Sequence, residues 1–327
     1  MGYIKWSDVF PVFSVLFVVL AIGCGNNTDR IDQLDTPVDT VSDIVDENIG
    51  LNETTESSSL ANPGYILYST ELPEWIVDPE LIETLYDGRI IVAGSNASDS
   101  MAMLSHDLGR VEGYLFQEGR RAQTAIRSDG ASIYTLIVLV LNKYDISSGR
   151  HLDVPVSLSS TAYWTFDYNS GMFLTVSTLN NSTVLLQWIN SAGTVIQSVE
   201  DPLRIDGDDN PLIMVPNGVA LDSNRNAWVT SGADDKVFIY RMNGQLLTTF
   251  SNTYVPVCIR RYNDKMVIGS GQSFGVYDLD GERIQGGMFP DYCIDFSVAA
   301  NGNIVALTRS GLVLRMDIPC LYDYGAN

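Results

Sequence analysis

The densest group of candidate metal-binding oxygens in the sequence lies in one short segment between two strand-like regions. Four carboxylates, Asp201, Asp206, Asp208 and Asp209, are followed by the amide of Asn210. Carboxylate and amide oxygens are the ligands that Ca²⁺ prefers, but the spacing departs from the EF-hand pattern and no bidentate glutamate follows. The segment therefore supports two hypotheses, a calcium site at Asp206, Asp208 and Asp209 or a solvated loop. No other cofactor is predicted.

Histidines offer little material for catalysis, because the chain has only two, His106 and His151. Histidine is the usual general acid or base near neutral pH and a common zinc ligand. Each of the two lies beside a turn, at Gly109 and Gly149, and we expect both at an outer edge of the fold. Neither a Ser-His-Asp arrangement nor a glycine-rich phosphate loop is visible. The sequence names no catalytic residue.

The cysteines of the chain permit a disulfide but do not establish one. Besides Cys24, the chain has Cys258, Cys293 and Cys320. Three cysteines permit one bridge with one thiol left over, and outside the cytoplasm a bridge persists. Cys258 could pair with Cys293, Cys293 could pair with Cys320, or all three could be isolated thiols in the core. Sequence spacing alone does not decide which cysteines pair, because pairing depends on the distance between their Cα atoms.

Composition excludes two broad classes of protein. The 327 residues include 40 acidic and 19 basic side chains, for a net charge of −21. Affinity for nucleic acid comes largely from cationic side chains that neutralise phosphates, so no nucleic-acid partner is expected. Hydrophobic residues make up 45% of the chain and aromatic residues 10%, which is enough for a core and excludes wholesale disorder.

The elements that position these residues repeat about every forty residues from Pro63 onward. Strand-like apolar runs alternate with turns rich in Gly, Asn, Asp and Ser, residue types that tolerate positive φ. One kind of turn recurs at Asp87-Gly88, Asp129-Gly130, Asn169-Ser170-Gly171, Ser223–Asn226, Asn263-Asp264 and Asn301-Gly302. A second kind follows about twenty residues later, at Asp107–Gly109, Ser147–Gly149, Ser191–Gly193, Asn243-Gly244 and Asp280-Gly281. The unit of four strands appears six times, which predicts an all-β, six-bladed β-propeller of four-stranded antiparallel blades.

One unit has a more specific motif. It runs from Pro216-Asn217-Gly218 through Val219-Ala220-Leu221-Asp222 and Ala227-Trp228-Val229-Thr230 to Asn243-Gly244. This unit resembles the NHL repeat, whose blades read Pro-x-Gly-hydrophobic-Ala-hydrophobic-Asp, then an aromatic-Val-Thr strand, then a strand ending in Asp/Asn-Gly. The likeness is partial in residues 254–317 and only a rhythm of strands before that. It implies the same propeller architecture over residues of about 65–320.

The two ends of the predicted ring should meet. The last unit ends near Pro319 and lacks a fourth strand, whereas Tyr65–Leu72 has strand character and precedes the first full unit. An open stack of sheets leaves unpaired edges. We therefore expect Tyr65–Leu72 to complete the last blade.

Asn217 and Asp291 form a second candidate metal site. Pro216-Asn217-Gly218, together with Pro290-Asp291 and Asp295, resembles part of the metal site of gluconolactonase-like six-bladed hydrolases. That resemblance implies a divalent metal in the central channel and a lactonase or lyase activity. The two pieces lie nearly two blades apart here and one blade apart in that family. The simpler interpretation is that Pro-Asn-Gly leads into an inner strand.

The four tryptophans of the predicted domain suit either a sugar-stacking surface or the core; they are Trp75, Trp164, Trp188 and Trp228. Propeller cores use such aromatics routinely. Trp228 lies in a predicted central strand, and we expect it in the core.

The N-terminal part predicts a targeting signal followed by a tether. Lys5 precedes an apolar run that is too short to span a bilayer of ~30 Å and suits a secretory signal. The run ends in Leu20-Ala21-Ile22-Gly23-Cys24, which resembles the bacterial lipobox and implies lipidation of Cys24, with Gly25 favouring the outer membrane. Residues 25–62 hold nine acids, one arginine and no aromatic residue, as expected of a disordered linker. We predict a signal peptide over 1–23, a lipidated acidic tether over 24–62 and a propeller over 63–327.

These observations predict an extracytoplasmic propeller anchored to the lipid membrane through acylated Cys24, at the outer membrane or the cell surface. The first hypothesis for its function is a binding and scaffold module that presents its loop faces to a protein, a peptide or a glycan. The alternative is the metal-dependent lactonase or lyase. A purely structural role in the envelope is a third, weaker hypothesis.

Overall fold

The computed structural model describes residues 65–72, 79–94, 101–109, 111–116, 125–137, 140–148, 150–152, 162–179, 183–200, 216–232, 235–252 and 255–318. Every regular element within these ranges is a β-strand. Across this part of the chain, no helix has the length and apolarity needed to cross a bilayer. The predicted leader, tether and lipidation site all precede the described residues.

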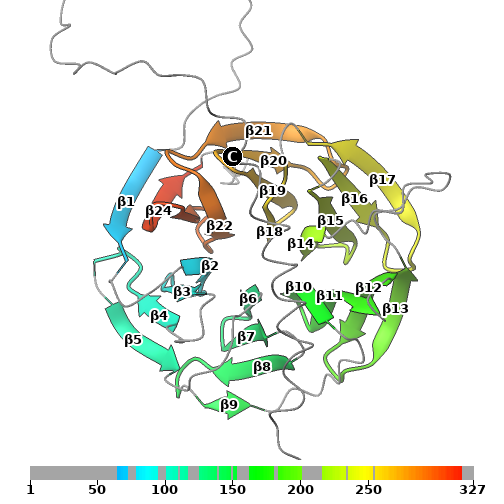
Figure 1. Ribbon diagram of the computed structural model, residues 1–327, viewed down its shortest axis with the longest axis horizontal. Helices are drawn as coiled ribbons and strands as arrows, with labels where there is room; N and C mark the ends of the chain where they lie inside the picture. The colour runs from blue at the N-terminus through cyan, green and yellow to red at the C-terminus, as the bar shows by residue number, and fades with distance from the viewer. Residues whose placement is uncertain are drawn as a thin grey trace, which may run out of the picture. The chain divides into compact units, whose positions relative to one another are not determined.

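Six sheets of four antiparallel strands make up the fold. Each of the first five blades takes four consecutive strands, with the first strand innermost (Figure 1). Blade 1 consists of β2 (Pro79–Thr84), β3 (Ile90–Gly94), β4 (Met101–Leu104) and β5 (Val111–Phe116). Blade 2 consists of β6 (Ala125–Ser128), β7 (Ser132–Ile137), β8 (Val140–Asp145) and β9 (His151–Leu152). Blade 3 consists of β10 (Ala162–Asn169), β11 (Met172–Leu179), β12 (Thr183–Asn190) and β13 (Val195–Glu200).

The remaining blades follow the same order. Blade 4 consists of β14 (Pro216–Leu221), β15 (Ala227–Ser231), β16 (Lys236–Tyr240) and β17 (Leu246–Ser251). Blade 5 consists of β18 (Cys258–Tyr262), β19 (Lys265–Ser270), β20 (Ser273–Tyr277) and β21 (Arg283–Met288). Blade 6 consists of β22 (Cys293–Val298), β23 (Ile304–Thr308), β24 (Leu312–Asp317) and, from the other end of the domain, β1 (Tyr65–Glu71). The structure thus confirms an all-β, six-bladed propeller.

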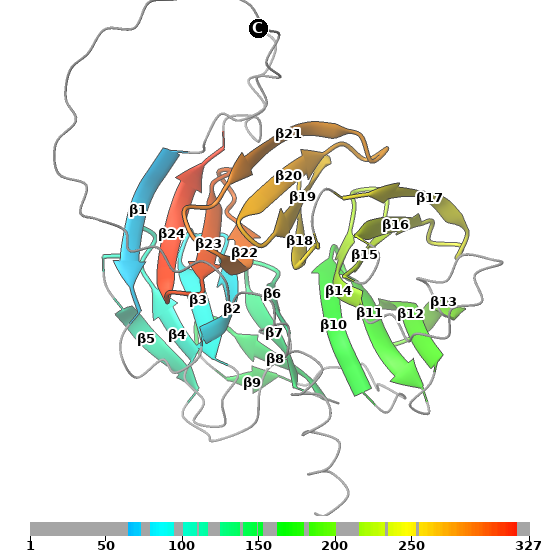
Figure 2. The ribbon, with the colours of Figure 1, turned by 45° about the horizontal axis from the view of Figure 1, so that its top comes forward.

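The ring closes between the first strand and the last. Strand β1 pairs antiparallel with β24, from Tyr65 opposite Asp317 to Glu71 opposite Leu312. Figure 2 shows β1 lying outside β24, as the outermost strand of that blade. The predicted closure by Tyr65–Leu72 is therefore confirmed.

The turn after the innermost strand of each blade recurs with the same backbone conformation. Backbone φ is positive at Gly88, Gly130, Gly171 and Gly302 in the first kind of turn, and Arg225 (φ 64°) and Asn263 (φ 50°) take that place in the other two blades. Side-chain oxygens brace several of these turns. The carboxylate of Asp222 accepts the backbone N–H of Asn224 and of Asn226, both at 2.8 Å. Such Asx contacts hold a tight turn without help from the core.

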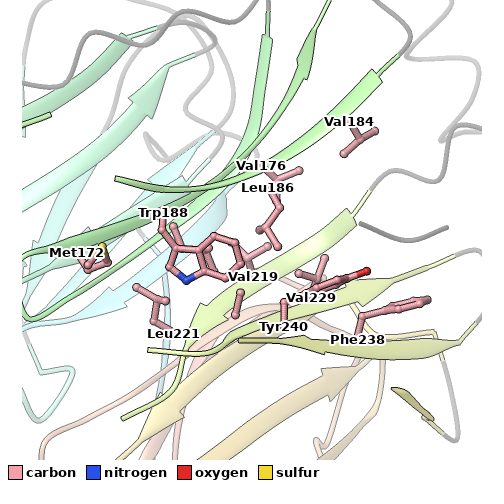
Figure 3. Close-up of a cluster of buried hydrophobic side chains, with 12 residues drawn as sticks. Met172, Val176, Val184, Leu186, Trp188, Val219, Leu221, Val229, Phe238 and Tyr240 are labelled. Atoms are coloured by element: carbon pink, nitrogen blue, oxygen red, sulfur yellow. The ribbon is translucent and has the colours of Figure 1, made fainter. Parts of the chain in front are cut away.

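The core lies between neighbouring sheets. Six clusters of buried apolar side chains fill the six junctions between blades. Figure 3 shows the junction of blades 3 and 4, where Trp188 and Leu186 face Val219, Val229 and Phe238. Successive residues of a middle strand serve two junctions, because side chains alternate between the faces of a sheet. The middle strands therefore need apolar residues on both faces, and they read as continuous apolar runs.

One sequence-predicted strand is wrong in its extent. The largely apolar run Ser132–Val140 follows the turn at Asp129-Gly130 and predicts a single strand, but it spans two, β7 and the start of β8. Ile137 pairs with Val140 in the hairpin between them. The residues on both sides of the division are apolar, and no Gly or Pro lies between Ile137 and Val140 to mark it.

Candidate binding site in the central channel

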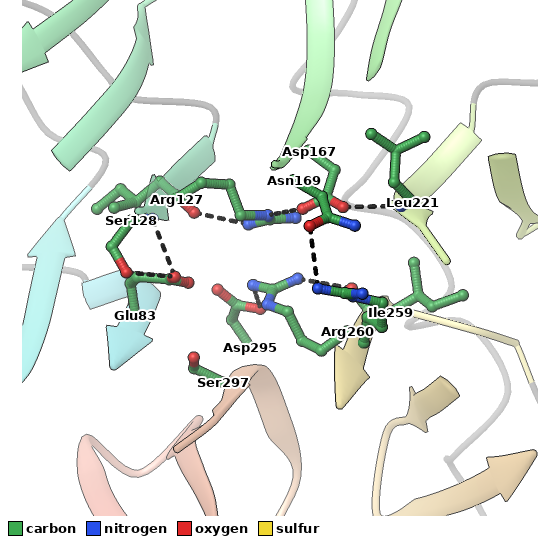
Figure 4. A network of polar contacts seen from close by, with 12 residues as sticks. Glu83, Arg127, Ser128, Asp167, Asn169, Leu221, Ile259, Arg260, Asp295 and Ser297 are labelled. Carbon is green, nitrogen blue, oxygen red and sulfur yellow. Dashed lines mark hydrogen bonds and ion pairs between the residues drawn. The ribbon is translucent and has the colours of Figure 1, made fainter. Parts of the chain in front are cut away.

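Charged side chains occupy the inner strands of five blades, at the centre of an otherwise apolar fold. They are Glu83 on β2, Arg127 on β6, Asp167 on β10, Arg260 on β18 and Asp295 on β22, each at most 9% exposed. Figure 4 shows them converging from different blades. Burial of charged groups costs free energy unless they are paired and hydrogen-bonded, so their partners decide what the site can do.

Two ion pairs join inner strands of neighbouring blades. Arg127 Nε lies 2.9 Å from Asp167 Oδ1, between blades 2 and 3. Arg260 Nη2 lies 2.7 Å from Asp295 Oδ1, between blades 5 and 6. Each arginine also donates to the carbonyl of the residue before it, Ile126 or Ile259. The same contact is thus built twice, three blades apart.

The two aspartates extend this arrangement to the next blade. Asp167 Oδ2 accepts the backbone N–H of Leu221 on β14 at 2.7 Å. Asp295 Oδ2 accepts the backbone N–H of Ile82 on β2 at 3.1 Å. Each arginine further lies near an aromatic ring of the following blade, Phe166 at 5.9 Å or Phe296 at 5.8 Å. The inner ring therefore has an approximate two-fold repeat, with blades 2–4 matching blades 5, 6 and 1.

Other polar contacts complete the circle. Glu83 Oε1 accepts the backbone N–H of Ser128 at 3.1 Å, which joins blade 1 to blade 2. Asn217 Nδ2 donates to the carbonyl of Pro256 at 2.7 Å, which joins blade 4 to blade 5. With the ion pairs and the aspartate contacts, side chains cross all six junctions around the channel.

Glu83 breaks the two-fold repeat. Strand β14, three blades away, has no titratable residue, so the carboxyl of Glu83 has no counterpart. Burial raises the pKa of Glu83 to about 7, an effect that Arg127 and Arg260 oppose and that Asp295 and Asp167 reinforce. Its second oxygen, Oε2, is buried and accepts no hydrogen bond from the described residues. The protonation of this group is therefore balanced near neutral pH.

A cavity of about 140 Å³ lies at this point of the channel. Its lining comes from the inner strands of five blades: Glu83, Arg127, Ser128, Asp167, Tyr168, Asn169, Arg260, Arg261, Ser297 and Val298. Arg261 Nη2 donates to Asn169 Oδ1 at 3.0 Å, and both residues line the cavity. Arg260 Nε, like Glu83 Oε2, is buried and has no hydrogen-bond partner in the part of the chain that the structure describes. Several polar groups thus converge on one small cavity, which makes it the candidate ligand site within the described residues.

The metal ligands predicted from the sequence are not brought together in the described residues. Asp206, Asp208 and Asp209 lie in the segment after β13, outside those residues. Asn217 is exposed and holds Pro256, while Asp291 accepts the backbone N–H groups of Tyr292 and Ser310. In the described ranges, no three His, Cys, Asp or Glu side chains are grouped to hold a metal.

The cysteines that open the last two blades lie in one buried cluster. Cys258 begins β18 and Cys293 begins β22, and both are free thiols in the structure. Burial raises the pKa of each thiol. Their bridge is thus not formed here, and Cys320 lies beyond the described residues. The pairing of Cys320 stays a prediction.

Other sequence-predicted residues occupy structural positions. His106 is exposed in the turn between β4 and β5, as expected. Trp188 and Trp228 are fully buried, which confirms Trp228 as a core residue and removes Trp188 from any stacking surface. Trp75 and the side chains of Trp164 and His151 are outside what the structure describes.

The five buried charged residues of the channel were not predicted as a group from the sequence. Asp295 was singled out only as a metal ligand, and Glu83, Arg127, Asp167 and Arg260 were not singled out at all. One signal was available, because each is a charged residue inside the short apolar run that begins a repeat unit. A charge inside a strand buried on both faces needs a partner, and that partner here lies in another blade.

Comparison with known proteins supports the fold alone. No family model and no curated protein sequence matches the chain. A solved chain of the mitotic checkpoint complex has a TM-score of 0.55 and 9% identity, over 86% of this chain and 99% of that one. A protein of unknown function from Bacteroides caccae has a TM-score of 0.53 and 13% identity, over 72% of this chain and 96% of that one. Both likenesses agree with a β-propeller, and at such identities neither transfers a function.

Proposed function

We propose that this protein is a binding module of the bacterial cell envelope, whose propeller holds its partner at the mouth of the central channel. The observation that carries the proposal is the polar cavity that five blades line. Two of its lining residues, Glu83 and Arg260, each have a buried atom, Oε2 and Nε, without a hydrogen-bond partner among the described residues. Hydrogen-bonding groups buried without partners cost free energy that a ligand can recover. The partner is a protein, a peptide or a glycan with a polar group small enough to enter the cavity.

The ring around the cavity supports this role. Side-chain contacts cross every junction between the inner strands, so the cavity walls are held in fixed positions before any ligand arrives. A site that is already ordered loses little conformational entropy on binding. The charged side chains of the channel thus both join the inner strands and line the proposed binding site.

The location belongs to the same proposal. Acylation of Cys24 would anchor the chain, with each buried methylene of the lipid contributing about 0.8 kcal/mol. The acidic tether over residues 25–62 would hold the propeller away from the lipid surface, because like charges extend a chain. The NHL-like motif that begins at Pro216 supports kinship with that repeat family. Localisation at the outer membrane or the cell surface completes the proposal.

Site-directed photo-crosslinking of the full-length chain tests the partner. A photoreactive residue at Val298, which lines the cavity, should capture an envelope protein, peptide or glycan. The matched position is Thr249, an exposed residue on the outer strand β17, which should capture nothing specific. Capture from Thr249 alone, or from neither position, would contradict the proposal. Turnover of lactones by the metal-loaded protein would instead support the lactonase class.

A further inference from the structure

The charges that line the cavity do not balance when Glu83 is neutral. Arg127, Arg260 and Arg261 contribute three positive charges, and Asp167 on the wall and Asp295 behind it contribute two negative ones. Among the described residues, Glu83 forms no ion pair, and Arg261 donates to the neutral side chain of Asn169. Neutrality is reached either when Glu83 ionises or when an anion enters.

The groups without partners specify what kind of anion fits. Arg260 Nε carries a hydrogen that no acceptor within the described ranges takes. Glu83 Oε2 becomes a donor when the carboxyl is protonated, since Oε1 already accepts from Ser128. Two unused donors call for a ligand that only accepts hydrogen bonds. A carboxylate is such a ligand, and arginine is its preferred partner.

The size of the cavity limits the ligand. At about 30 Å³ per water molecule in the liquid, a volume of about 140 Å³ holds a group of about four or five heavy atoms. Drug-sized ligands need about 300 Å³ or more. A small carboxylic acid fits whole, and a larger molecule can insert only a terminal carboxylate.

We propose that the cavity binds one small carboxylate anion together with one proton, which is taken up by Glu83. This inference rests on the proposed function and names the ligand class of the same site. The groups that face Glu83 are Arg127 and Ser128 from β6, Asp167 from β10, Arg260 from β18 and Asp295 from β22. The proton removes repulsion between Glu83 and the ligand, and the arginines bind the anion.

Calorimetric titration of the full-length protein with acetate tests the proposal, with acetamide as the neutral ligand of the same shape. Acetate should bind, and acetamide should not. Affinity for acetate should be at least about tenfold higher near pH 6 than near pH 8.5, because those values lie on either side of the pKa of Glu83. Near pH 8.5, titrations in buffers of different ionisation enthalpy should show uptake of almost one proton per acetate.

Variants separate the site from the fold. Glu83→Gln should bind acetate with an affinity that no longer changes with pH, since the amide donates a hydrogen bond at every pH. Arg261→Gln should weaken acetate binding about tenfold. Arg283→Gln, an exposed arginine on β21, should leave it unchanged. Unfolding curves identify any variant that fails to fold.

Three results would overturn the proposal: folded wild-type protein that does not bind acetate, equal binding of acetate and acetamide, or a pH dependence that survives Glu83→Gln. Crosslinking of a macromolecular partner at Val298 without acetate binding would remove this inference and leave the proposed function standing. Acetate binding without any crosslinked partner would contradict the proposed function and leave the carboxylate site standing.

Discussion

Arginine and aspartate side chains in the channel link the inner strands of this propeller. Arg127 and Asp167 are both buried, and Asp167 also holds the backbone of Leu221 in the following blade. A buried pair of this kind adds little net stability compared with apolar side chains, but removal of one partner leaves an uncompensated charge. The pairs therefore fix the relative positions of the blades more than they stabilise the fold.

Arg127→Met should lower the free energy of unfolding by about 3 kcal/mol, because Asp167 then stays buried without its cation. Urea denaturation followed by fluorescence measures the change. Arg241→Met, at an exposed arginine, should change stability by less than about 0.5 kcal/mol. Equal stability of the two variants would show that Arg127 does not compensate Asp167.

Glu83 should make stability depend on pH near neutrality. Its folded pKa is raised to about 7 from an ordinary value of 4.5, so the folded state binds the proton more tightly than the unfolded state does. The resulting stability is fully present below about pH 4.5 and is lost as the pH rises toward 7, by at most about 3 kcal/mol. Glu83→Gln should remove this decline in thermal melts between about pH 5 and pH 8. The exposed Glu282→Gln should retain it, and an unchanged slope in Glu83→Gln would contradict the assignment.

At the scale of the elements, the closing strand β1 decides whether the ring is complete. It supplies the outer edge of blade 6 from the opposite end of the domain, and its partner β24 would otherwise be an exposed edge. Blades with only one neighbour bury little apolar area, so closure couples all six. The domain should therefore unfold in one transition.

Deletion of residues 65–72 should lower the melting temperature by at least about 10 °C, which corresponds to a loss of about 3 kcal/mol or more for a domain of this size. Calorimetry of the full-length chain measures the shift. Deletion of residues 49–56, an equal length of the predicted tether, serves as the matched control and should leave the melting temperature unchanged. Identical melting of the two deletion variants would show that β1 is dispensable.

At the scale of the whole molecule, the proposed anchor and the propeller divide the work. Under the proposal, the anchor would restrict the protein to a membrane surface, and the cavity would select what it holds there. The net charge of −21 repels anions at long range, yet three arginines surround the cavity. A carboxylate that reaches the channel is therefore selected by local contacts and not by the field of the molecule.

Cys24→Ser should release the protein from the membrane fraction, because the hydroxyl cannot take the place of the thiol in lipid attachment. Mass spectrometry of the wild-type protein should find Cys24 as the acylated N-terminal residue, with residues 1–23 removed. Cys258→Ser, at a buried thiol of the propeller, should keep the membrane location. An unmodified Cys24 with the apolar stretch still attached would contradict the anchor.

The architecture was predictable from sequence because its signals are local. Turns at Gly88, Gly130 and Gly302 need positive φ, and that need shows in the residue types at each position. Apolar runs between the turns show the strands, and the unpaired Tyr65–Leu72 showed the closure. The division between β7 and β8 was missed because no Gly or Pro marks it in the sequence.

The site was decided by the tertiary structure. Ile82 and Asp295 are 213 residues apart in sequence and 3.1 Å apart between the bonded atoms, and no spacing within the chain announces such a contact. A buried charge indicates only that it needs a partner. Which blade provides that partner, and that Glu83 is left with an unused oxygen, depends on where the ring brings its inner strands together.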